Sequence, residues 1–189
     1  MQKKISLLYC FVSEYNYLEL SSLNKNIHII YRNYKKNIDI STLISLKKYC
    51  KKNNKKLFIS NNIKLALRHK LDGIYIPAFN NQLNYVKFTL PKSFIIIGSA
   101  HNVNEITTKQ TQGCKFIFIS PIFEVKKTNH YLDIIKFNLL ALQKKSKFIA
   151  LGGINSKNIK RLNLLKISGF AGISFFKKKT APKRGRLCN

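Results

Sequence analysis

Eight short apolar segments recur along the chain and are separated by polar, lysine-rich stretches. Most of them are continuous apolar runs rather than alternating patterns, which is typical of strands that are buried on both faces. We therefore predict eight buried strands. They span residues 5–12, 27–31, 57–59, 73–76, 94–97, 116–119, 148–151 and 171–176.

The polar stretches between these runs predict helices. In the clearest one, Asp39 and Ser41 supply capping groups, while Leu43, Ile44 and Leu46 form an apolar side opposite several lysines. The predicted helices cover residues 15–23, 41–53, 63–69, a segment that begins near Asn102 or Asn104, 134–143 and 156–167.

Strands that alternate with helices predict an α/β protein with an all-parallel sheet covered by helices. Eight such strands close into a (β/α)8 TIM barrel, and an open, doubly wound sheet is the alternative. No amphipathic segment follows Phe176, so the eighth helix is missing or is replaced by the basic tail or a partner subunit. We expect one barrel domain over residues 1–176 and a basic, flexible tail over residues 177–189.

Charge is the most unusual feature of the composition, because 35 Lys and Arg residues stand against 7 Asp and Glu, for a net charge of +28. Such a field attracts any polyanion, from small phosphorylated substrates to RNA. The lysines are spread over nearly every predicted helix and loop. We therefore interpret the charge mainly as solvated surface and do not favour nucleic acid as the partner.

Hydropathy and cysteine usage indicate the compartment. Hydrophobic residues make up 45% of the chain, yet no apolar run approaches about 18 residues, so we expect no membrane span. The four cysteines, Cys10, Cys50, Cys114 and Cys188, are far apart and lack the spacing of a zinc site. They are typical of reduced, mostly buried thiols, which favours a cytoplasmic protein.

Residues 148–176 predict a strand, a glycine turn, a helix and a second strand. Gly152 and Gly153 allow backbone angles that are closed to other residues and a close approach of N–H groups to a ligand. Asn155 and Ser156 supply capping groups for a helix whose positive end faces the same spot. This arrangement suits a phosphate group. A turn that only connects strand and helix is the alternative.

In a (β/α)8 barrel the site lies at the carboxyl ends of the strands. This rule selects Glu14, Arg32, Ser60, Asn61, residues 77–80, Ser99, His101, residues 120–128, Gly152, Gly153 and the residues around Phe175.

The motifs at these strand ends occur in a characteristic order. Arg32 follows the second strand, and the later motifs are SNNIKLAL, DGIYIP, SAHN, SPIFEVKK, ALGGIN and GFAGISFF, at the third to the eighth strand. Together they resemble the thiamine phosphate synthase and thiazole tautomerase superfamily over nearly the whole chain.

The resemblance implies one of two activities. A synthase joins hydroxymethylpyrimidine diphosphate to thiazole phosphate and releases pyrophosphate with the help of Mg²⁺. A tautomerase moves a proton to aromatise thiazole phosphate. Either activity implies small phosphorylated substrates, and the resemblance leaves a homo-oligomer open.

The resemblance also implies roles for particular residues. Catalytic positions are occupied by Ser99, His101, Glu124 and Lys126. Positions that bind the substrate or its phosphate are occupied by Arg32, Ser60, Asn61, Gly152, Gly153, Phe175 and Phe176. Tyr34 stands where a second cation is expected after Arg32.

The metal positions implied by the resemblance are the least well matched. Asn61 and Asn80 stand where the family has acidic ligands. Mg²⁺ prefers hard, charged oxygen ligands, and two amides supply none of that charge.

Three hypotheses follow from the sequence. The first is a divergent thiamine phosphate synthase. The second is a tautomerase-like enzyme that uses His101 or Glu124 to move a proton. The third is a non-catalytic barrel that binds RNA through its basic tail.

Overall fold

All eight apolar segments form strands, and the strands close into a parallel barrel in the order β1 to β8. The computed structural model describes residues 6–34, 38–125, 130–142 and 146–177. The (β/α)8 prediction is therefore confirmed and the open sheet is excluded. The strands are β1 (Leu7–Val12), β2 (Ile27–Tyr31), β3 (Leu57–Ser60), β4 (Gly73–Ile76), β5 (Ile95–Ala100), β6 (Phe116–Ile119), β7 (Lys147–Leu151) and β8 (Gly169–Gly172).

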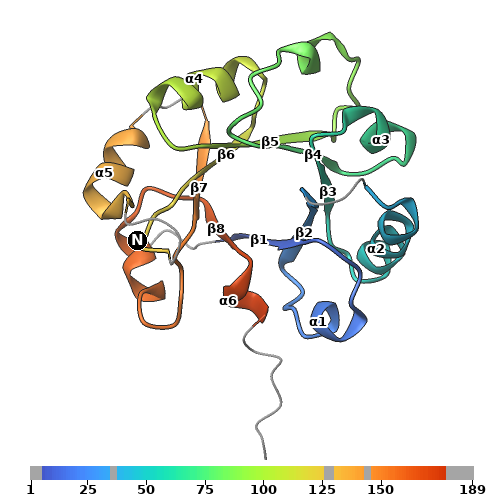
Figure 1. Ribbon diagram of the computed structural model, residues 1–189, viewed down its shortest axis with the longest axis horizontal. Coiled ribbons are helices and arrows are strands. Elements are labelled where there is room, and N and C mark those ends of the chain that lie inside the picture. The colour runs from blue at the N-terminus through green and yellow to red at the C-terminus, as the bar shows by residue number, and fades with distance from the viewer. Residues whose placement is uncertain (1–5, 35–37, 126–129, 143–145, 178–189) are drawn as a thin grey trace, which may run out of the picture.

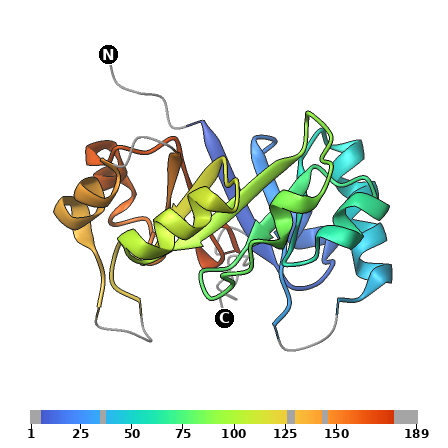
Figure 2. The same ribbon diagram turned by 90° about the horizontal axis from the view of Figure 1, so that it is seen from above.

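A helical segment follows each strand, and these segments surround the barrel (Figure 1). Figure 2 shows α2 and α3 on one flank and α5 on the opposite flank. The segments are α1 (Tyr17–Ser21), α2 (Ile40–Lys52), α3 (Ile63–Arg68), the 3₁₀ helix η1 (Asn84–Lys87), α4 (Val103–Thr111), α5 (Asp133–Leu140), the 3₁₀ helix η2 (Ile159–Leu164) and α6 (Ser174–Lys177).

Side-chain caps fix the starts of the two longest helices. The Asp39 carboxylate accepts hydrogen bonds from the N–H groups of Ser41 (3.0 Å) and Thr42 (3.1 Å) and caps α2. Asn102 Oδ1 accepts from the N–H of Glu105 (2.9 Å) and caps α4. Each cap satisfies N–H groups that have no partner within the helix. The predicted start of α2 is confirmed, and Asn102 is the cap of α4.

The barrel interior is filled by side chains, mostly aromatic ones. Ring centroids lie 5.1 Å apart for Phe11 and Tyr75 and 5.2 Å apart for Tyr9 and Phe118. The other face of each strand packs against the helices in a second buried cluster. Burial on both faces explains the unbroken apolar runs in the sequence. The buried interior residues are Tyr9, Phe11, Ile30, Phe58, Tyr75, Ile97, Phe116, Phe118, Ile149 and Ala171.

The segment after β7 differs from the predicted helix over residues 156–167. Asn155 Oδ1 accepts from the N–H groups of Lys157 (2.9 Å) and Asn158 (3.2 Å), and Asn158 Nδ2 donates to the Gly153 carbonyl (2.8 Å). These local bonds compete with a regular helix. Only the 3₁₀ helix η2 forms, and it begins at Ile159. The expected positive helix end at Ser156 is therefore absent.

The end of the eighth strand also differs from the prediction. β8 stops at Gly172, and Phe175 and Phe176 belong to the one-turn helix α6 rather than to a strand. A strand would send these neighbouring rings to opposite faces. In the helical turn, both rings contact Phe170, with centroids 5.5 Å and 5.7 Å from it. Phe170, Phe175 and Phe176 thus form an aromatic cluster. This cluster covers the side of the barrel for which the sequence predicted no eighth helix. Residues 178–189 of the predicted tail lie outside the described residues.

None of the helices in the described part of the chain is both long enough and apolar enough to cross a lipid bilayer.

The aromatic cluster predicts a large stability effect for Phe176→Ala. Phe176 is 8% exposed and packs with Phe170 and Phe175, so we expect a loss of about 3 kcal/mol of unfolding free energy. Urea denaturation measures this quantity. Ile135→Ala is the control, because Ile135 is 76% exposed and its truncation should cost less than about 0.5 kcal/mol. An equal effect of the two substitutions would show that α6 does not cover the barrel.

Candidate active site at the barrel mouth

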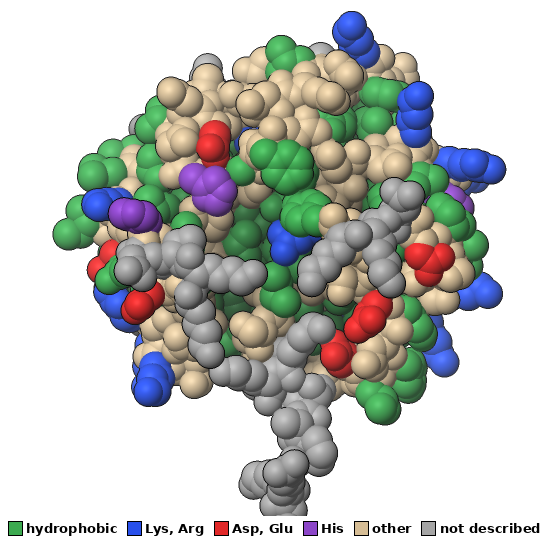
Figure 3. Space-filling view, in the orientation of Figure 1, with side chains coloured by type: hydrophobic (Ala, Val, Ile, Leu, Met, Phe, Trp, Pro, Cys, Tyr) green, Lys and Arg blue, Asp and Glu red, His purple; other side chains and the backbone are tan. Residues whose placement is uncertain are grey.

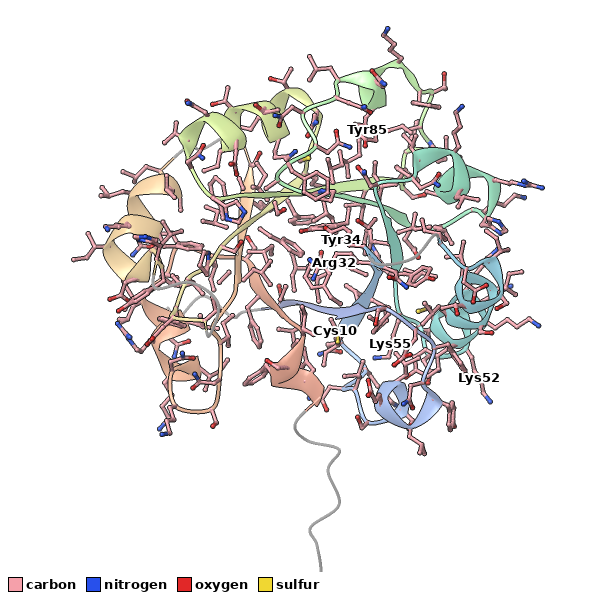
Figure 4. All side chains as sticks on the ribbon, in the orientation of Figure 1. Cys10, Arg32, Tyr34, Lys52, Lys55 and Tyr85 are labelled. Atoms are coloured by element: carbon pink, nitrogen blue, oxygen red, sulfur yellow. The ribbon has the colours of Figure 1, made fainter. Side chains whose placement is uncertain are left out.

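Arg32 projects from the end of β2 into the barrel mouth. Its N–H donates to the Val12 carbonyl (2.8 Å), which continues the β1–β2 ladder by one residue. Its guanidinium carbon lies 4.3 Å from the centroid of the Phe11 ring and 5.0 Å from that of Tyr34. Figure 4 shows Arg32 and Tyr34 beside each other near the centre of the barrel. The cation therefore rests on the aromatic interior at the mouth, where its fork of donors can reach a ligand.

The floor of the mouth is apolar, and most cationic side chains lie at the outer edge of this face. Figure 3 shows hydrophobic side chains within the central hollow and most of the lysines and arginines at the periphery of this face. Tyr75 donates its hydroxyl hydrogen to Ser99 Oγ (2.9 Å). Burial raises the pKa of the Tyr75 phenol to about 12, so this hydroxyl stays a donor at neutral pH.

Ser99 lies within β5, because this strand continues to Ala100 rather than ending at Ile97 as predicted. The side chain is 4% exposed and accepts the Tyr75 bond. The structure thus puts Ser99 at the base of the mouth.

A cavity of about 520 Å³ opens beside Arg32. Tyr34 and Phe79 lie at its rim with ring centroids 5.8 Å apart, and Ser60 and Asn61 line it. Ser60 is 7% exposed, and its Oγ has no hydrogen-bond partner among the described residues. A buried hydroxyl without a partner is costly, so this oxygen is a candidate contact for a ligand or a water. The cavity brings together two of the predicted binding residues, Ser60 and Asn61. Arg32 does not line it but contacts Tyr34, which does. Its lining residues are Tyr31, Asn33, Tyr34, Ile38, Ser60, Asn61, Asn62, Leu65 and Phe79.

Asn61 and Asn80, the expected metal positions, bond to each other. Asn80 Nδ2 donates to Asn61 Oδ1 and to Tyr85 Oη (2.8 Å), and the Tyr85 hydroxyl donates to Asn61 Oδ1 (3.0 Å). No group of three or more His, Cys, Asp or Glu side chains within the described ranges could hold a metal ion. A divalent cation would have to displace these bonds and bind uncharged amides. The residues present do not fit Mg²⁺ at this position.

Two further residues, Lys109 and Gln112 of the α4 region, support the hydrogen bonds among Asn61, Asn80 and Tyr85 by binding the main chain of Asn80. Both are 0% exposed. Lys109 Nζ and Gln112 Nε2 donate to the Asn80 carbonyl at 2.6 Å and 2.9 Å. Desolvation by burial lowers the pKa of Lys109. Neither residue could be recognised from the sequence, because a lysine within a helix of a basic protein is expected at the surface.

The Gly152–Gly153 turn lies against the segment that follows β6. Both glycines have positive φ, +89° and +72°. A Cβ on Gly153 would lie 2.3 Å from the Phe123 carbonyl oxygen, and one on Gly152 would lie 2.9 Å from Pro121 Cα. The Phe123 N–H also donates to the Gly152 carbonyl (3.2 Å). Only glycine fits this close approach at these angles.

The β7–β8 ladder brings the glycine turn next to α6. Leu151 pairs with Ala171, so Gly152 and Gly172 follow at adjacent strand ends. The predicted phosphate residues thus lie on neighbouring elements. Phe175 and Phe176 direct their rings into the aromatic cluster, so only their main chain is available for a phosphate.

His101 lies directly after β5 and faces the loop after β6. Its Nδ1 is 2.6 Å from the Ser120 carbonyl oxygen. A carbonyl only accepts, so Nδ1 carries the hydrogen of this bond, and Nε2 is the ring nitrogen left for a proton transfer. Glu124 is exposed, and its carbonyl lies beside Gly153. Lys126, the remaining predicted catalytic residue, lies outside the described residues.

The fold and this mouth define a (β/α)8 barrel protein whose polar groups gather at the carboxyl ends of the strands. The chain belongs to the thiamine monophosphate synthase family, whose sequence profile matches residues 27–176. This finding confirms the resemblance expected from the motif order.

Individual relatives agree with this family. The chain is 30% identical to a thiamine-phosphate synthase of Prochlorococcus marinus subsp. pastoris over 162 residues, which is 83% of this chain and 46% of that protein. It is 23% identical to a thiamine-phosphate synthase of Lactococcus lactis subsp. cremoris over 158 residues, which is 82% of this chain and 72% of that protein. The chain thus spans less than half the length of its Prochlorococcus relative.

A solved structure shares the fold. Thiamine phosphate pyrophosphorylase from Pyrococcus furiosus superposes with a TM-score of 0.70 at 16% identity, over 95% of this chain and 93% of that one.

The glycine turn predicts a strong effect of Gly153→Ala. The added Cβ would meet the Phe123 carbonyl at a φ of +72°, so we expect a loss of about 3 kcal/mol or more of unfolding free energy. Gly113→Ala is the matched control. Gly113 has a similar φ of +78°, but its nearest neighbour would be 3.8 Å away, so only about 1 kcal/mol for the left-handed backbone is expected. Equal losses in chemical denaturation would contradict the close packing of this turn.

Proposed function

We propose that this chain is a thiamine-phosphate synthase. It would be a transferase that joins hydroxymethylpyrimidine diphosphate to thiazole phosphate and releases pyrophosphate. Family membership supports the reaction class, and the observation that carries the proposal is Arg32, whose guanidinium lies on the Phe11 ring at the mouth beside a cavity of about 520 Å³.

The reaction requires a site that binds the leaving group. The bond between the pyrimidine methylene carbon and the diphosphate oxygen breaks, and its electron pair leaves with the diphosphate, while the thiazole nitrogen forms the new bond to that carbon. Negative charge therefore grows on the diphosphate oxygen. A guanidinium held near it stabilises the transition state more than the ground state. Arg32 is the residue we assign to this role, and its fork of donors matches phosphate oxygens.

The remaining predicted residues divide between the two substrates. Ser60 and Asn61 line the cavity next to Arg32, so we assign them to the pyrimidine diphosphate. Gly152, Gly153 and the main chain at Phe175 and Phe176 lie at neighbouring strand ends, and we assign them to the thiazole phosphate. The close packing of the glycine turn supports this assignment, because it keeps the turn in one conformation.

A second candidate function is proton transfer on thiazole phosphate. The bond between His101 Nδ1 and the Ser120 carbonyl favours it, because it leaves Nε2 able to accept a proton. Ser99, Glu124 and Lys126 would assist in either reaction. We propose small phosphorylated substrates and a cytoplasmic location for both. RNA binding through residues 177–189 is a third hypothesis that rests on charge alone.

Arg32→Gln tests the synthase proposal. We expect the variant to lose about 100-fold or more in kcat/KM for thiamine phosphate formation, because one transition-state donor group is removed. The assay supplies both substrates and Mg²⁺. Arg68→Gln is the matched control, since it removes the same charge from an exposed position at the end of α3; its activity should stay within about twofold. Absence of product from the folded wild type would refute the synthase assignment.

His101→Ala tests the second candidate. Exchange of the thiazole phosphate proton in D₂O, followed by NMR, should slow by about 100-fold or more if His101 moves the proton. His69→Ala is the control, because His69 lies at the C-terminal end of α3, before the start of β4. Exchange that is unchanged in His101→Ala excludes this role.

A further inference from the structure

The hydrogen bonds of Asn61 and Asn80 leave no ligand for a metal at this edge of the mouth. The Gln82 N–H donates to Asn80 Oδ1 (2.9 Å), which fixes the direction of the Asn80 amide. Its Nδ2 therefore faces Asn61 Oδ1 and Tyr85 Oη. Asn61 Oδ1 accepts from Asn80 and from Tyr85, so both of its lone pairs are engaged. Neither amide presents an unengaged oxygen to a cation.

A buried ammonium supports this network from the side of α4. Lys109 Nζ donates to the Asn80 carbonyl (2.6 Å) and to Gln112 Oε1 (2.9 Å). Gln112 Nε2 donates to the carbonyls of Asn80 (2.9 Å) and Gln82 (2.8 Å). The short bond from Lys109 is typical of a charge-assisted contact. Together, the two side chains hold the main chain of residues 80–82.

The barrel makes room for this lysine. A Cβ at Gly98 would lie 2.8 Å from Lys109 Cδ and 2.8 Å from Cys114 Sγ. The Lys109 stem therefore passes over β5 where there is no side chain. Among the residues that the structure describes, no carboxylate forms an ion pair with it. The fully buried charge of Lys109 is paired with carbonyl and amide oxygens instead. This arrangement is unusual, and loss of one of these hydrogen bonds would cost considerable free energy.

The network controls the shape of the cavity beside Arg32. Asn80 holds Asn61, which lines that cavity together with Ser60, and Phe79 at its rim precedes Asn80. A divalent cation with acidic ligands on β3 and β4 would fix the same two loops by binding both. In this chain, hydrogen bonds fix them instead. The unpartnered hydroxyl of Ser60 remains in the cavity wall as an independent sign of a ligand.

We propose that the Asn61–Asn80–Tyr85 network, anchored by Lys109, takes the place of a divalent metal at this edge of the mouth. The chain then binds a diphosphate through Arg32 and the cavity wall, without a metal held by Asn61 and Asn80. Lys109 is a positioning residue, since it acts through Asn80 and does not reach the ligand. This inference rests on the proposed function, which supplies the diphosphate.

Inorganic pyrophosphate is the probe for the metal. Calorimetric titration of the full chain, at a salt concentration that screens its net charge, compares affinity in EDTA with affinity in Mg²⁺. The wild type should change by less than about threefold, whereas Asn61→Asp/Asn80→Asp should bind at least about tenfold more tightly when Mg²⁺ is added. A wild type that gains as much from Mg²⁺ as the double variant overturns the inference.

Lys109→Met tests the positioning role with the same probe. Removing the ammonium should weaken pyrophosphate binding by about tenfold or more, because the loop after β4 loses the charged hydrogen bond at the Asn80 carbonyl. Lys55→Met is the matched control. Lys55 is also buried, and its Nζ donates to the carbonyls of Asn24 (2.6 Å), which precedes β2, and of Ile27 (3.2 Å), the first residue of β2, at the opposite end of the barrel. Its variant should bind pyrophosphate within about twofold of the wild type.

Each variant is compared below its own unfolding temperature, as monitored by circular dichroism. If Lys109→Met does not fold, Gln112→Met is used instead. It removes the uncharged donor to the Asn80 carbonyl and should also weaken pyrophosphate binding. Unchanged affinity in the folded variant shows that Lys109 only stabilises the fold and refutes its positioning role.

Thiamine phosphate formation separates the two proposals. If no thiamine phosphate forms but pyrophosphate binds equally well with and without Mg²⁺, only the proposed synthase function is refuted. If thiamine phosphate forms but the wild type binds pyrophosphate more tightly with Mg²⁺, only the proposal that the network replaces the metal is refuted.

Discussion

Aromatic packing inside a closed barrel is the constraint on which the remaining structure depends. The interior is filled by rings such as Phe11, Tyr75 and Phe118, which contact one another at centroid distances of 5.1–6.0 Å. An interior of this kind has no room for charged groups, so polar chemistry is confined to the strand ends. Arg32 connects the aromatic interior with the mouth, because its guanidinium lies on the Phe11 ring and still faces the mouth. The position of the candidate site thus follows from the packing below it.

The charge balance determines how loops are held. Seven acidic residues cannot pair with 35 basic ones, and the salt bridge found among the described residues, Arg161–Asp133, is half exposed. The two buried lysines of the described part, Lys55 and Lys109, bond to main-chain carbonyls instead. Each ammonium ties loops at one end of the barrel. Burial makes such bonds stronger than exposed ion pairs, because less water competes for the groups.

The sequence predicted the architecture well where a single physical signal dominated. The apolar runs at Gly73–Ile76 and Phe116–Ile119 are strands with the predicted bounds, and Asp39 caps the helix that it was expected to start. The order of motifs also led to the family. These features depend on local composition and spacing, which one sequence contains in full.

The prediction failed where tertiary contacts decide the conformation. Phe175 and Phe176 continue an apolar run, yet their contacts with Phe170 favour a helical turn. Asn155 looked like a helix cap, but it closes a turn that precedes a 3₁₀ helix. Lys109 looked like a surface residue, although it completes the network at Asn80. The roles of Ser99, His101 and Glu124 remain predictions, because contacts alone do not assign a chemical step.

The bare backbone at Gly98 couples three positions that are distant in the sequence. Lys109 and Cys114 occupy the space where a side chain at position 98 would lie, so even a methyl group there would press on the stem of a buried cation. Residues 98, 109 and 114 are thus constrained as one unit, and a change of volume at one of them must be accommodated by the other two.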